Sequence, residues 1–155
     1  PGGSLYLATK NRYALRYVIG KGDEHMHYLP FGNALPRWLG RLTLHLKGLP
    51  RAPGLLHSHA ALGRMLRQAG FDRLRSFWAT PEMRYPAEYV PTDPAAIRAA
   101  RRRPGFVQGD ARSVRLLMRW VPAPLVKHLT PGLAFVATKG ATQPSTSTSK
   151  TAATA

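Results

Sequence analysis

One short segment gathers side chains that could carry out acid and base chemistry. Residues 23–27 read Asp-Glu-His-Met-His, which places carboxylates and imidazoles close together in the chain. His25 could act as a base beside Asp23, because imidazole titrates near neutral pH and a carboxylate can orient its ring. The same side chains bind metals, but they lack helical ligand spacing and a distant partner. We therefore predict His25 and Asp23 as candidate catalytic residues and no metal site, with a solvated loop as the alternative.

Three other side chains could bind a substrate. Asn11 follows an apolar run and could orient a polar group with its amide, although the same amide suits a turn or a helix cap. Arg84 could bind a phosphate or carboxylate, and Tyr85 could form an aromatic wall for a sugar. The alternative is an arginine that packs over Tyr85 or Tyr89. We predict Asn11, Arg84 and Tyr85 as substrate-binding residues.

Apolar runs predict the strands that must position these residues. Residues 4–9 (SLYLAT) and 133–138 (LAFVAT) are short and uninterrupted, as in buried strands, whereas residues 73–80 alternate, as in a strand near a sheet edge. We expect the last strand to lie between the other two and antiparallel to both. Two parallel strands joined by a helix place their carboxyl ends at one sheet edge, where ligands bind. The segments 11–27 and 81–89 should then form one pocket.

The clearest predicted helix spans residues 58–69. Leu62, Met65 and Leu66 form an apolar stripe at helical spacing. Ser58 suits the N-cap because its hydroxyl can accept from free first-turn amides, and Gly70 suits the position after the helix because it can adopt positive φ. This helix would connect the first two strands.

Weaker signals predict the remaining elements. Asp93 before Pro94 predicts a helix over residues 94–102, because proline is favoured in a first turn. Apolar spacing predicts another over 111–120, interrupted by prolines at 122 and 124. One or two helical turns before Gly20 and a short helix over 36–46 are also expected. The prolines at 81, 86, 91 and 94 predict an ordered loop rather than a helix or central strand.

Composition excludes several classes of protein. The chain has 155 residues, 44% of them hydrophobic, which is enough for one domain with a core. It has no cysteine, so thiol catalysis and disulfides are excluded. No apolar run is long enough for a membrane span, and no secretion signal is evident, so we expect a cytoplasmic protein. The tail over residues 140–155 lacks large apolar side chains and is predicted to be disordered.

The charge is strongly positive. There are 23 lysines and arginines against 7 acidic residues, a formal net charge of +16. Such a charge attracts nucleic acid, anionic lipid or phosphorylated substrates. Most of the arginines are dispersed, however, whereas a dedicated nucleic-acid binder usually concentrates its charge on one face. A small basic nucleic-acid-binding protein is therefore the alternative function.

Three motifs resemble the C-terminal portion of class I S-adenosylmethionine-dependent methyltransferases. PGGSLYLATKN resembles their fifth strand, HSHAALGRMLRQAGFDRLRSFWAT their next helix and sixth strand, and PGLAFVATK their antiparallel seventh strand. The stretch from NRYALRYVIGKGDEH through WATPEMRYP further resembles methyltransferases of bacterial surface-polysaccharide gene clusters. The resemblance covers residues 1–139 and implies an α/β fold: the C-terminal half of a Rossmann-like sheet with a loop-rich insertion over residues 20–56.

The resemblance also implies a function. It implies methyl transfer from S-adenosylmethionine to a small-molecule or glycan acceptor, with this part of the enzyme binding the acceptor. The sequence has no methionine at its start, and we expect the family's first four strands to precede Pro1. The glycine-rich turn and the ribose-binding acid would lie there, so no cofactor-binding residue is predicted here. The fragment alone is expected to be inactive.

Overall fold

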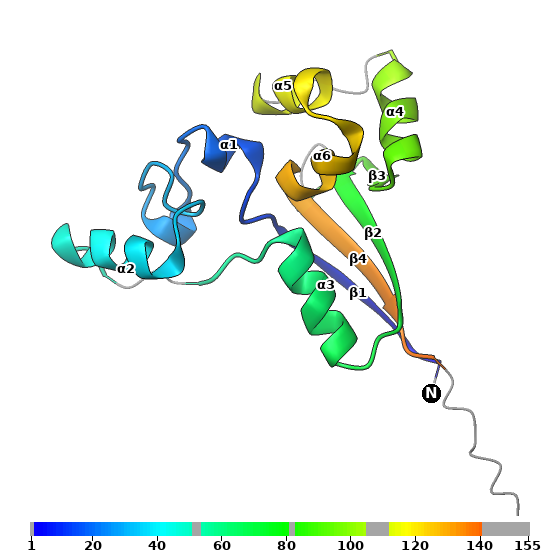
Figure 1. Cartoon of the computed structure of the whole chain (residues 1–155), viewed down its shortest axis with the longest axis horizontal. Helices are drawn as coiled ribbons and strands as arrows, with labels where there is room; N and C mark the ends of the chain where they lie inside the picture. Colours follow the sequence, from blue (N-terminus) through cyan, green and yellow to red (C-terminus); the bar gives the residue numbers. More distant parts are fainter. Residues whose placement is uncertain (1, 51–53, 81–82, 105–111, 141–155) are drawn as a thin grey trace, which may run out of the picture.

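A computed structural model describes residues 2–50, 54–80, 83–104 and 112–140 of the chain (Figure 1). These residues form an α/β structure with one four-stranded sheet and six α-helices. The strands are β1 (Ser4–Lys10), β2 (Arg73–Thr80), β3 (Glu88–Pro91) and β4 (Gly132–Thr138). The predicted tail lies outside the described residues, except for its first residue, Gly140.

The sheet has the strand order β1-β4-β2-β3. The central strand β4 is antiparallel to β1, with Leu7 opposite Phe135, and antiparallel to β2, with Ser76 opposite Phe135. β1 and β2 therefore run in the same direction. The prediction that the last strand lies between the first two and opposes both is confirmed. Uninterrupted apolar residues suit this position, because β4 pairs with a strand on each edge and most of its residues are buried.

The edge strand β3 corrects one prediction. The proline-rich segment after β2 was expected to be an ordered loop, but Glu88–Pro91 pairs with Phe77–Thr80 of β2. The prolines do not prevent this pairing, because Pro91 is the last residue of the strand and β3 has only one neighbour. β3 covers one edge of the C-terminal half of β2, so only the first half of β2 matches the expected edge position.

Local signals define α3 (His59–Gln68) and α4 (Pro94–Arg102). The Ser58 hydroxyl accepts from the Ala61 amide at 3.2 Å, and the Asp93 carboxylate accepts from the Ala96 amide at 2.9 Å. Gly70 has a φ of 84°, so it ends α3 in a conformation that glycine adopts without strain. Both predicted helices are confirmed.

Two more helices follow, α5 (Arg112–Trp120) and α6 (Ala123–Leu129). The first matches the predicted helix. α6 was not predicted, because Pro122 and Pro124 were interpreted as an interruption. Pro122 instead occupies the N-cap and Pro124 lies in the first turn, where a missing amide proton costs no hydrogen bond.

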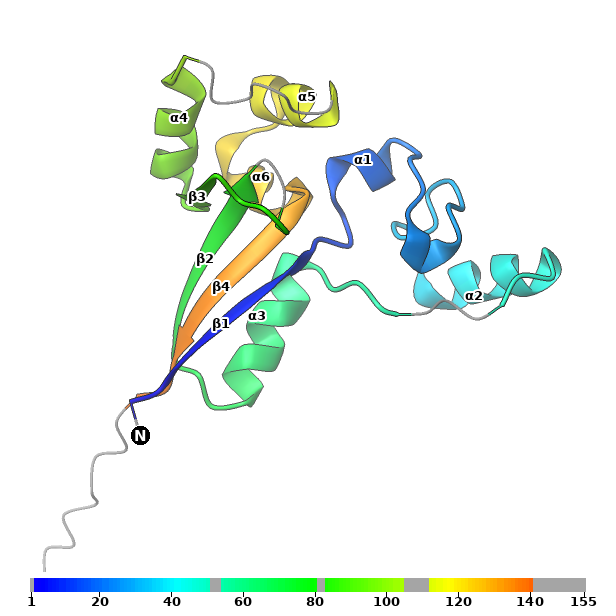
Figure 2. The ribbon, with the colours of Figure 1, turned by 180° about the vertical axis from the view of Figure 1, so that it is seen from behind.

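The helices cover one face of the sheet (Figures 1 and 2). Leu62 and Leu66 of α3 pack against Leu133 and Phe135 of β4. A second cluster joins Trp78 of β2 to apolar residues of α4, α5 and α6. From behind, in Figure 2, the strands lie in front of α3. The two clusters make a core on one side of the sheet only.

The segment between β1 and α3 projects away from the sheet (Figure 1). It contains the single turn α1 (Leu15–Val18), a 3₁₀ turn at Glu24–Met26, and α2 (Arg37–Leu46). The predicted turn before Gly20 and the predicted helix over 36–46 are thus confirmed. No helix in the described ranges combines the length and apolar character needed to cross a bilayer.

Candidate functional site

A cavity of about 290 Å³ lies at the carboxyl ends of β1 and β2. Lys10, the last residue of β1, lines it together with Asp23 and Glu24. Met83 and Arg84, which follow β2, line the opposite side. The segments 11–27 and 81–89 therefore contribute to one cavity, as predicted from the parallel direction of the two strands.

Asp23 organises the wall of this cavity. Its side chain is almost fully buried, and Oδ2 accepts from Lys10 Nζ at 3.0 Å, from the Tyr17 hydroxyl at 2.7 Å and from Arg16 Nη2 at 3.3 Å. Oδ1 accepts from the His25 amide at 3.0 Å and lies 2.5 Å from His25 Nδ1. Both carboxylate oxygens thus accept at least two hydrogen bonds each.

These contacts set the protonation states of the wall. Burial alone would raise the pKa of Asp23, but hydrogen bonds from Tyr17, His25 and Lys10 outweigh burial and hold this pKa well below its usual range. Burial and then the bond to Asp23 raise the pKa of Tyr17. A hydrogen bond from Lys10 lowers the pKa of Glu24. At neutral pH Asp23 and Glu24 are therefore carboxylates, paired with Lys10 and Arg16, and the buried phenol of Tyr17 behind them is neutral.

Arg84 differs from the other cations at the cavity. Lys10 pairs with Asp23 and Glu24, and Arg16 pairs with Asp23. Arg84 has no ion pair with any acidic residue in the described ranges, and its side chain is exposed. A guanidinium without a carboxylate partner at the rim of a cavity is free to bind an anionic group.

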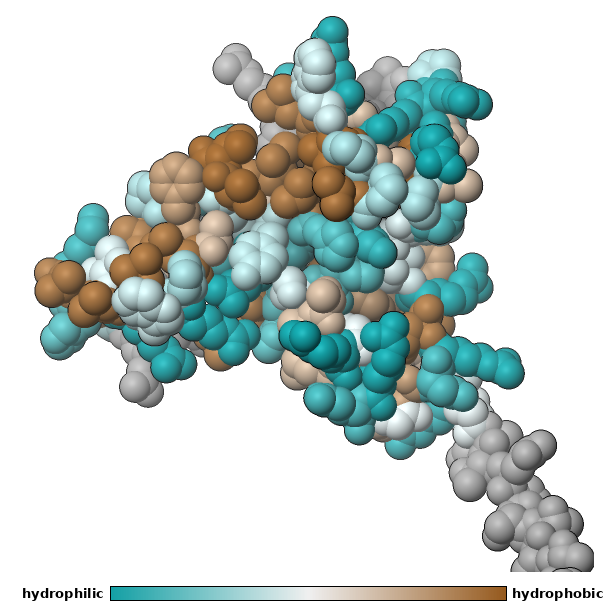
Figure 3. Space-filling model, viewed as in Figure 1, coloured by the Kyte–Doolittle hydropathy of each residue, from teal (hydrophilic) through white to brown (hydrophobic). Residues whose placement is uncertain are grey.

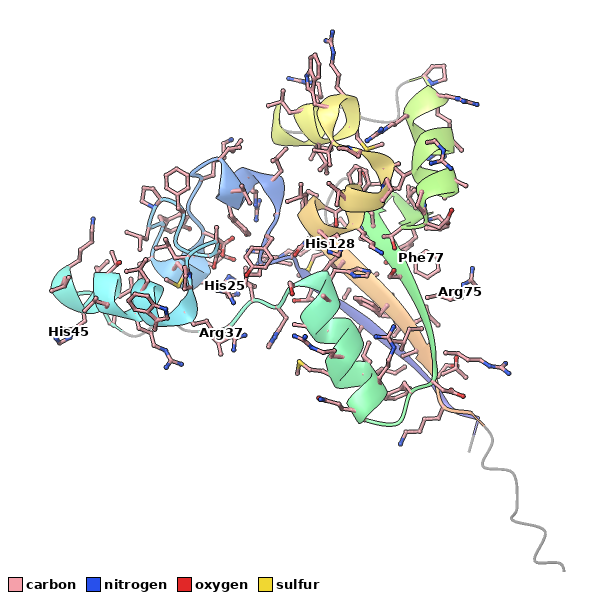
Figure 4. The ribbon with its side chains drawn as sticks, in the orientation of Figure 1. His25, Arg37, His45, Arg75, Phe77 and His128 are labelled. Atoms are coloured by element: carbon pink, nitrogen blue, oxygen red, sulfur yellow. The ribbon has the colours of Figure 1, made fainter. Side chains whose placement is uncertain are left out.

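The predicted base, His25, is connected to the site but does not line the cavity. Because the Asp23 carboxylate is ionised and can only accept, His25 Nδ1 donates to it at 2.5 Å. Figure 4 shows His25 between α2 and the chain that leads to α3. The structure thus brings Asp23 and His25 together and places only Asp23 in the cavity wall.

The other predicted residues take different positions. Asn11 is fully buried; its Nδ2 donates to the His128 carbonyl at 2.9 Å and its Oδ1 accepts from the Tyr13 amide at 3.2 Å. These are the contacts of a turn residue. Tyr85 is 79% exposed and does not line the cavity. Of the three predicted substrate-binding residues, only Arg84 lies at the cavity.

Sequence reasoning missed Lys10, Arg16 and Tyr28 as residues of the site. Alternation along β1 was the available signal for Lys10, because Tyr6, Ala8 and Lys10 share one face of the strand, whereas Asn11 falls on the other. Arg16 lies in the single turn α1, and Tyr28 follows the 3₁₀ turn; the path of the chain between β1 and α2 brings both to the cavity, and no spacing rule predicts this path.

A metal ion does not fit the acidic cluster as it stands. One ligand atom each from Asp23, Glu24 and His25 lies within 4.8 Å of the others. The Lys10 ammonium already bridges the two carboxylates, and His25 Nδ1 carries the proton that it donates to Asp23. A cation would have to displace Lys10 and deprotonate His25 Nδ1.

The described residues also do not fit S-adenosylmethionine. Gly20 and Gly22 form the sequence's single Gly-x-Gly, and they follow α1 rather than a strand. A Cβ at Gly22 would lie 2.2 Å from the Tyr28 carbonyl oxygen, so this turn is closed against its own chain. It offers no cradle for a cofactor.

Comparisons with protein-family models, curated proteins and solved structures find no match to the chain.

Proposed function

We propose that these residues form the acceptor-binding part of a class I S-adenosylmethionine-dependent methyltransferase, which transfers a methyl group to a small-molecule or glycan acceptor. The main support is β4, which lies antiparallel between the parallel strands β1 and β2. The resemblance of the three motifs implies this strand order. The cavity at the carboxyl ends of β1 and β2 is where an α/β sheet binds its ligands.

The cavity residues have two roles: the cluster around Asp23 forms a rigid wall, and the exposed Arg84 can contact the acceptor. Asp23, held by Lys10, Arg16 and Tyr17, fixes the shape of the wall. Arg84 supplies the free positive charge, which suits an acceptor with a carboxylate or phosphate. Methyl transfer depends mainly on alignment of the acceptor with the donor, so a fixed wall and one orienting cation suit this reaction.

We assign Asp23 a positioning role rather than proton removal. Its oxygens already accept five hydrogen bonds, and its pKa lies too far below neutrality for an effective base. His25 remains the candidate base, because Asp23 binds only its Nδ1 and leaves its Nε2 available. The His25 ring lies outside the cavity wall, so it could reach only an acceptor that extends beyond the cavity toward Gly54. A Cβ atom added at Gly54 would lie 3.4 Å from this ring.

The decisive experiment measures the steady-state kinetics of the full-length protein. Arg84→Ala should raise the KM for an anionic acceptor about tenfold or more and leave the KM for S-adenosylmethionine unchanged, because it removes a charge-assisted contact to one substrate. Arg64→Ala, which removes an equal exposed charge from α3, is the matched control. Equal effects of Arg84→Ala on both substrates would contradict the proposal.

Calorimetry of residues 1–155 with S-adenosylmethionine provides a second test. We expect no saturable binding, because the single Gly-x-Gly turn is closed against Tyr28. Tight binding by this chain would contradict the assignment of these residues to the acceptor alone. A strand followed by a glycine-rich turn, encoded upstream of Pro1, would support the proposal.

A second candidate function is the binding of single-stranded nucleic acid on the sheet face opposite the helices. Tyr6 and Tyr89 are 53% and 42% exposed there, and their hydroxyls lie 2.8 Å apart. The Arg75 guanidinium lies 5.3 Å from the centre of the Phe77 ring, and Figure 4 shows both side chains on the side away from α3. Exposed rings such as Tyr6 and Tyr89, and the half-buried Phe77 beside Arg75, could stack bases and bind phosphates.

Fluorescence anisotropy with a single-stranded oligonucleotide distinguishes the two functions. If this face binds nucleic acid, Phe77→Ala should weaken binding about fivefold or more, because base stacking contributes about 1–3 kcal/mol. Leu116→Ala, which truncates an exposed apolar side chain on α5, is the control. Equal affinities of both variants would show that binding, where it occurs, reflects only the net charge of +16.

A further inference from the structure

A second cavity, of about 170 Å³, lies between α2 and the chain that leads to α3. It shares no lining residue with the cavity at the ends of β1 and β2. Its apolar wall is formed by Met26, Leu35, Leu44, Leu55 and Leu56. An apolar cavity of about 150 Å³ is large enough for a benzene-sized molecule, so this one accommodates a body of about six carbon atoms.

One side of this second cavity carries only positive charge. Arg37 and Arg41 line it from consecutive turns of α2. Neither forms an ion pair within the described part of the chain, and no acidic residue lines the cavity. Figure 4 shows Arg37 at the inner end of α2, opposite His45 at the outer tip. The first turn of α2 has no acidic residue that would offset the positive end of the helix dipole. The dipole therefore adds to the positive potential of the two arginines.

Two further polar groups belong to the same wall. The Arg12 guanidinium donates to the carbonyls of Asn33, at 3.0 Å, and Leu35, at 2.6 Å, which fixes its charge beside the cavity. Asn33 is 7% exposed, and its Nδ2 is buried without a hydrogen-bond partner. A buried donor without an acceptor is costly, so a ligand oxygen that reached it would be stabilised.

We propose that this cavity binds a small amphipathic anion, with an apolar body of about six carbon atoms between Met26 and the leucines and a carboxylate or phosphate between Arg37 and Arg41. The apolar wall excludes a free sugar or an inorganic ion as the main ligand, because neither would bury apolar surface. The arginines disfavour a neutral hydrocarbon relative to an acid of the same size.

Isothermal titration with four probes tests this proposal. Hexanoate and hexyl phosphate combine both features, whereas hexanol lacks the charge and inorganic phosphate lacks the apolar body. We expect saturable binding of one or both amphipathic anions, and at least about tenfold weaker binding of hexanol and inorganic phosphate, because each lacks one of the two contributions. The stronger of the two anions identifies carboxylate or phosphate as the preferred group.

Two variants locate the binding site. The double variant Arg37→Gln, Arg41→Gln should weaken binding of the amphipathic anion about tenfold or more, because it removes both charge-assisted contacts. Arg64→Gln, Arg98→Gln removes the same charge from exposed positions on α3 and α4 and should have no effect. Equal losses in the two double variants would overturn the proposal in favour of nonspecific attraction to a basic surface.

Gly40→Ala tests the apolar part separately. Gly40 lines the cavity in the middle of α2, and a Cβ there would lie 3.0 Å from the flexible end of Met26. Alanine favours the helix, so the variant should remain folded while the added methyl group narrows the cavity and weakens binding of hexanoate. Unchanged affinity in this variant would place the ligand elsewhere. Arg84→Ala should not affect this binding, so failure here and failure of the methyltransferase proposal are distinguishable.

Discussion

The carboxylate of Asp23 connects side chains from three segments of the chain. Lys10 ends β1, Tyr17 belongs to α1, and His25 lies in the 3₁₀ turn. Each donates to Asp23, so a single buried charge fixes the projecting segment against the end of the sheet. Such a group is costly to bury without partners and stabilising with them.

Asp23→Asn should destabilise the protein by about 3 kcal/mol at neutral pH, because it leaves Lys10 and Arg16 beside a buried group without charge. Urea unfolding measures this difference. Glu88→Gln is the control, since it removes the carboxylate of an exposed pair with Arg103 and should cost less than about 1 kcal/mol. Similar losses in the two variants would contradict the central role of Asp23.

The same residue predicts a dependence on pH. Because the pKa of Asp23 is lowered in the folded state, its contribution is complete above the unfolded value, near pH 4, and is lost as the pH falls further. The stability difference between the wild type and Asp23→Asn should therefore shrink below about pH 4. A difference that stays constant down to pH 2 would show that folding does not lower the pKa of Asp23.

The sequence predicted some site residues and missed others for physical reasons. Asp23 and Arg84 were found because charged side chains in loops after strands are candidates by type alone. Asn11 was predicted in place of Lys10, because alternation along β1, which places Lys10 on the face of Tyr6 and Ala8, was not used. The roles of Arg16 and Tyr28 depend on the path of an irregular loop.

At the scale of one element, α3 depends on its N-cap. The Ser58 hydroxyl accepts from the Ala61 amide at 3.2 Å. Ser58→Ala should lower the free energy of unfolding by about 1 kcal/mol, measured by urea denaturation, because this amide would lose its acceptor. Ser58→Asp restores an acceptor and should recover most of the loss. Failure of Ser58→Asp to recover stability would mean that the hydroxyl contributes through packing instead.

The junction of α3 and α6 contains a half-buried histidine, His59. His59 of α3 lies 3.0 Å from the Ser76 hydroxyl and packs edge-to-face on His128 of α6, at 5.5 Å between ring centres. Burial lowers the pKa of His59 to about 4, and the nearby charges of Lys127, Arg67 and protonated His128 act in the same direction. Burial and Lys127 also lower the pKa of His128. The two imidazoles are therefore neutral in the folded protein at neutral pH.

This junction should weaken in mild acid. The unfolded chain protonates histidine near pH 6.5, whereas folded His59 resists protonation until about pH 4, so stability is complete above the first value and falls between the two. Urea midpoints between pH 7.5 and pH 4.5 measure this loss. His59→Gln should flatten the profile, whereas His45→Gln, on the exposed tip of α2, should not. An unchanged profile in His59→Gln would exclude His59 as the titrating group.

Elements with local signals were predicted well, and those defined by distant contacts were not. Caps and apolar spacing located α3 and α4 almost to the residue, since both signals act within one or two turns. β3 and α6 were missed because the prolines beside them were interpreted as interruptions. β3 forms because it pairs with β2, and Pro91 is its last residue. α6 forms because Val126 packs in the core, and Pro122 and Pro124 lie at its start.

At the scale of the whole molecule, coverage of the sheet is uneven. α3, α4, α5 and α6 cover one face, while Tyr6 and Tyr89 lie exposed on the other. Hydrophobic surface also lies over α2 and over the helices at the top of the view (Figure 3). β1 pairs only with β4 within the described residues, so its second edge has free backbone groups.

The hydrogen-bond pattern identifies which amides lie at this edge. The amide of Asn11 donates to the Pro131 carbonyl at 3.0 Å, and that of Lys139 donates to the Gly3 carbonyl at 3.1 Å. In an antiparallel ladder, hydrogen-bonded pairs alternate with pairs that are not hydrogen-bonded to each other. Odd-numbered residues of β1 therefore direct their amides toward β4, and even-numbered residues direct theirs toward the open edge.

Amide hydrogen exchange of residues 1–155 should reproduce this alternation. We expect slow exchange at Leu5, Leu7 and Thr9 and exchange at least about a hundredfold faster at Tyr6 and Ala8, because an edge amide exchanges without opening of the sheet. The measurement is made by NMR at several protein concentrations. Protection of Tyr6 and Ala8 that rises with concentration would show edge-to-edge pairing of two copies, and protection independent of concentration would contradict an open β1 edge. In a longer protein whose additional strand pairs with β1, the same two amides should become as slow as their neighbours.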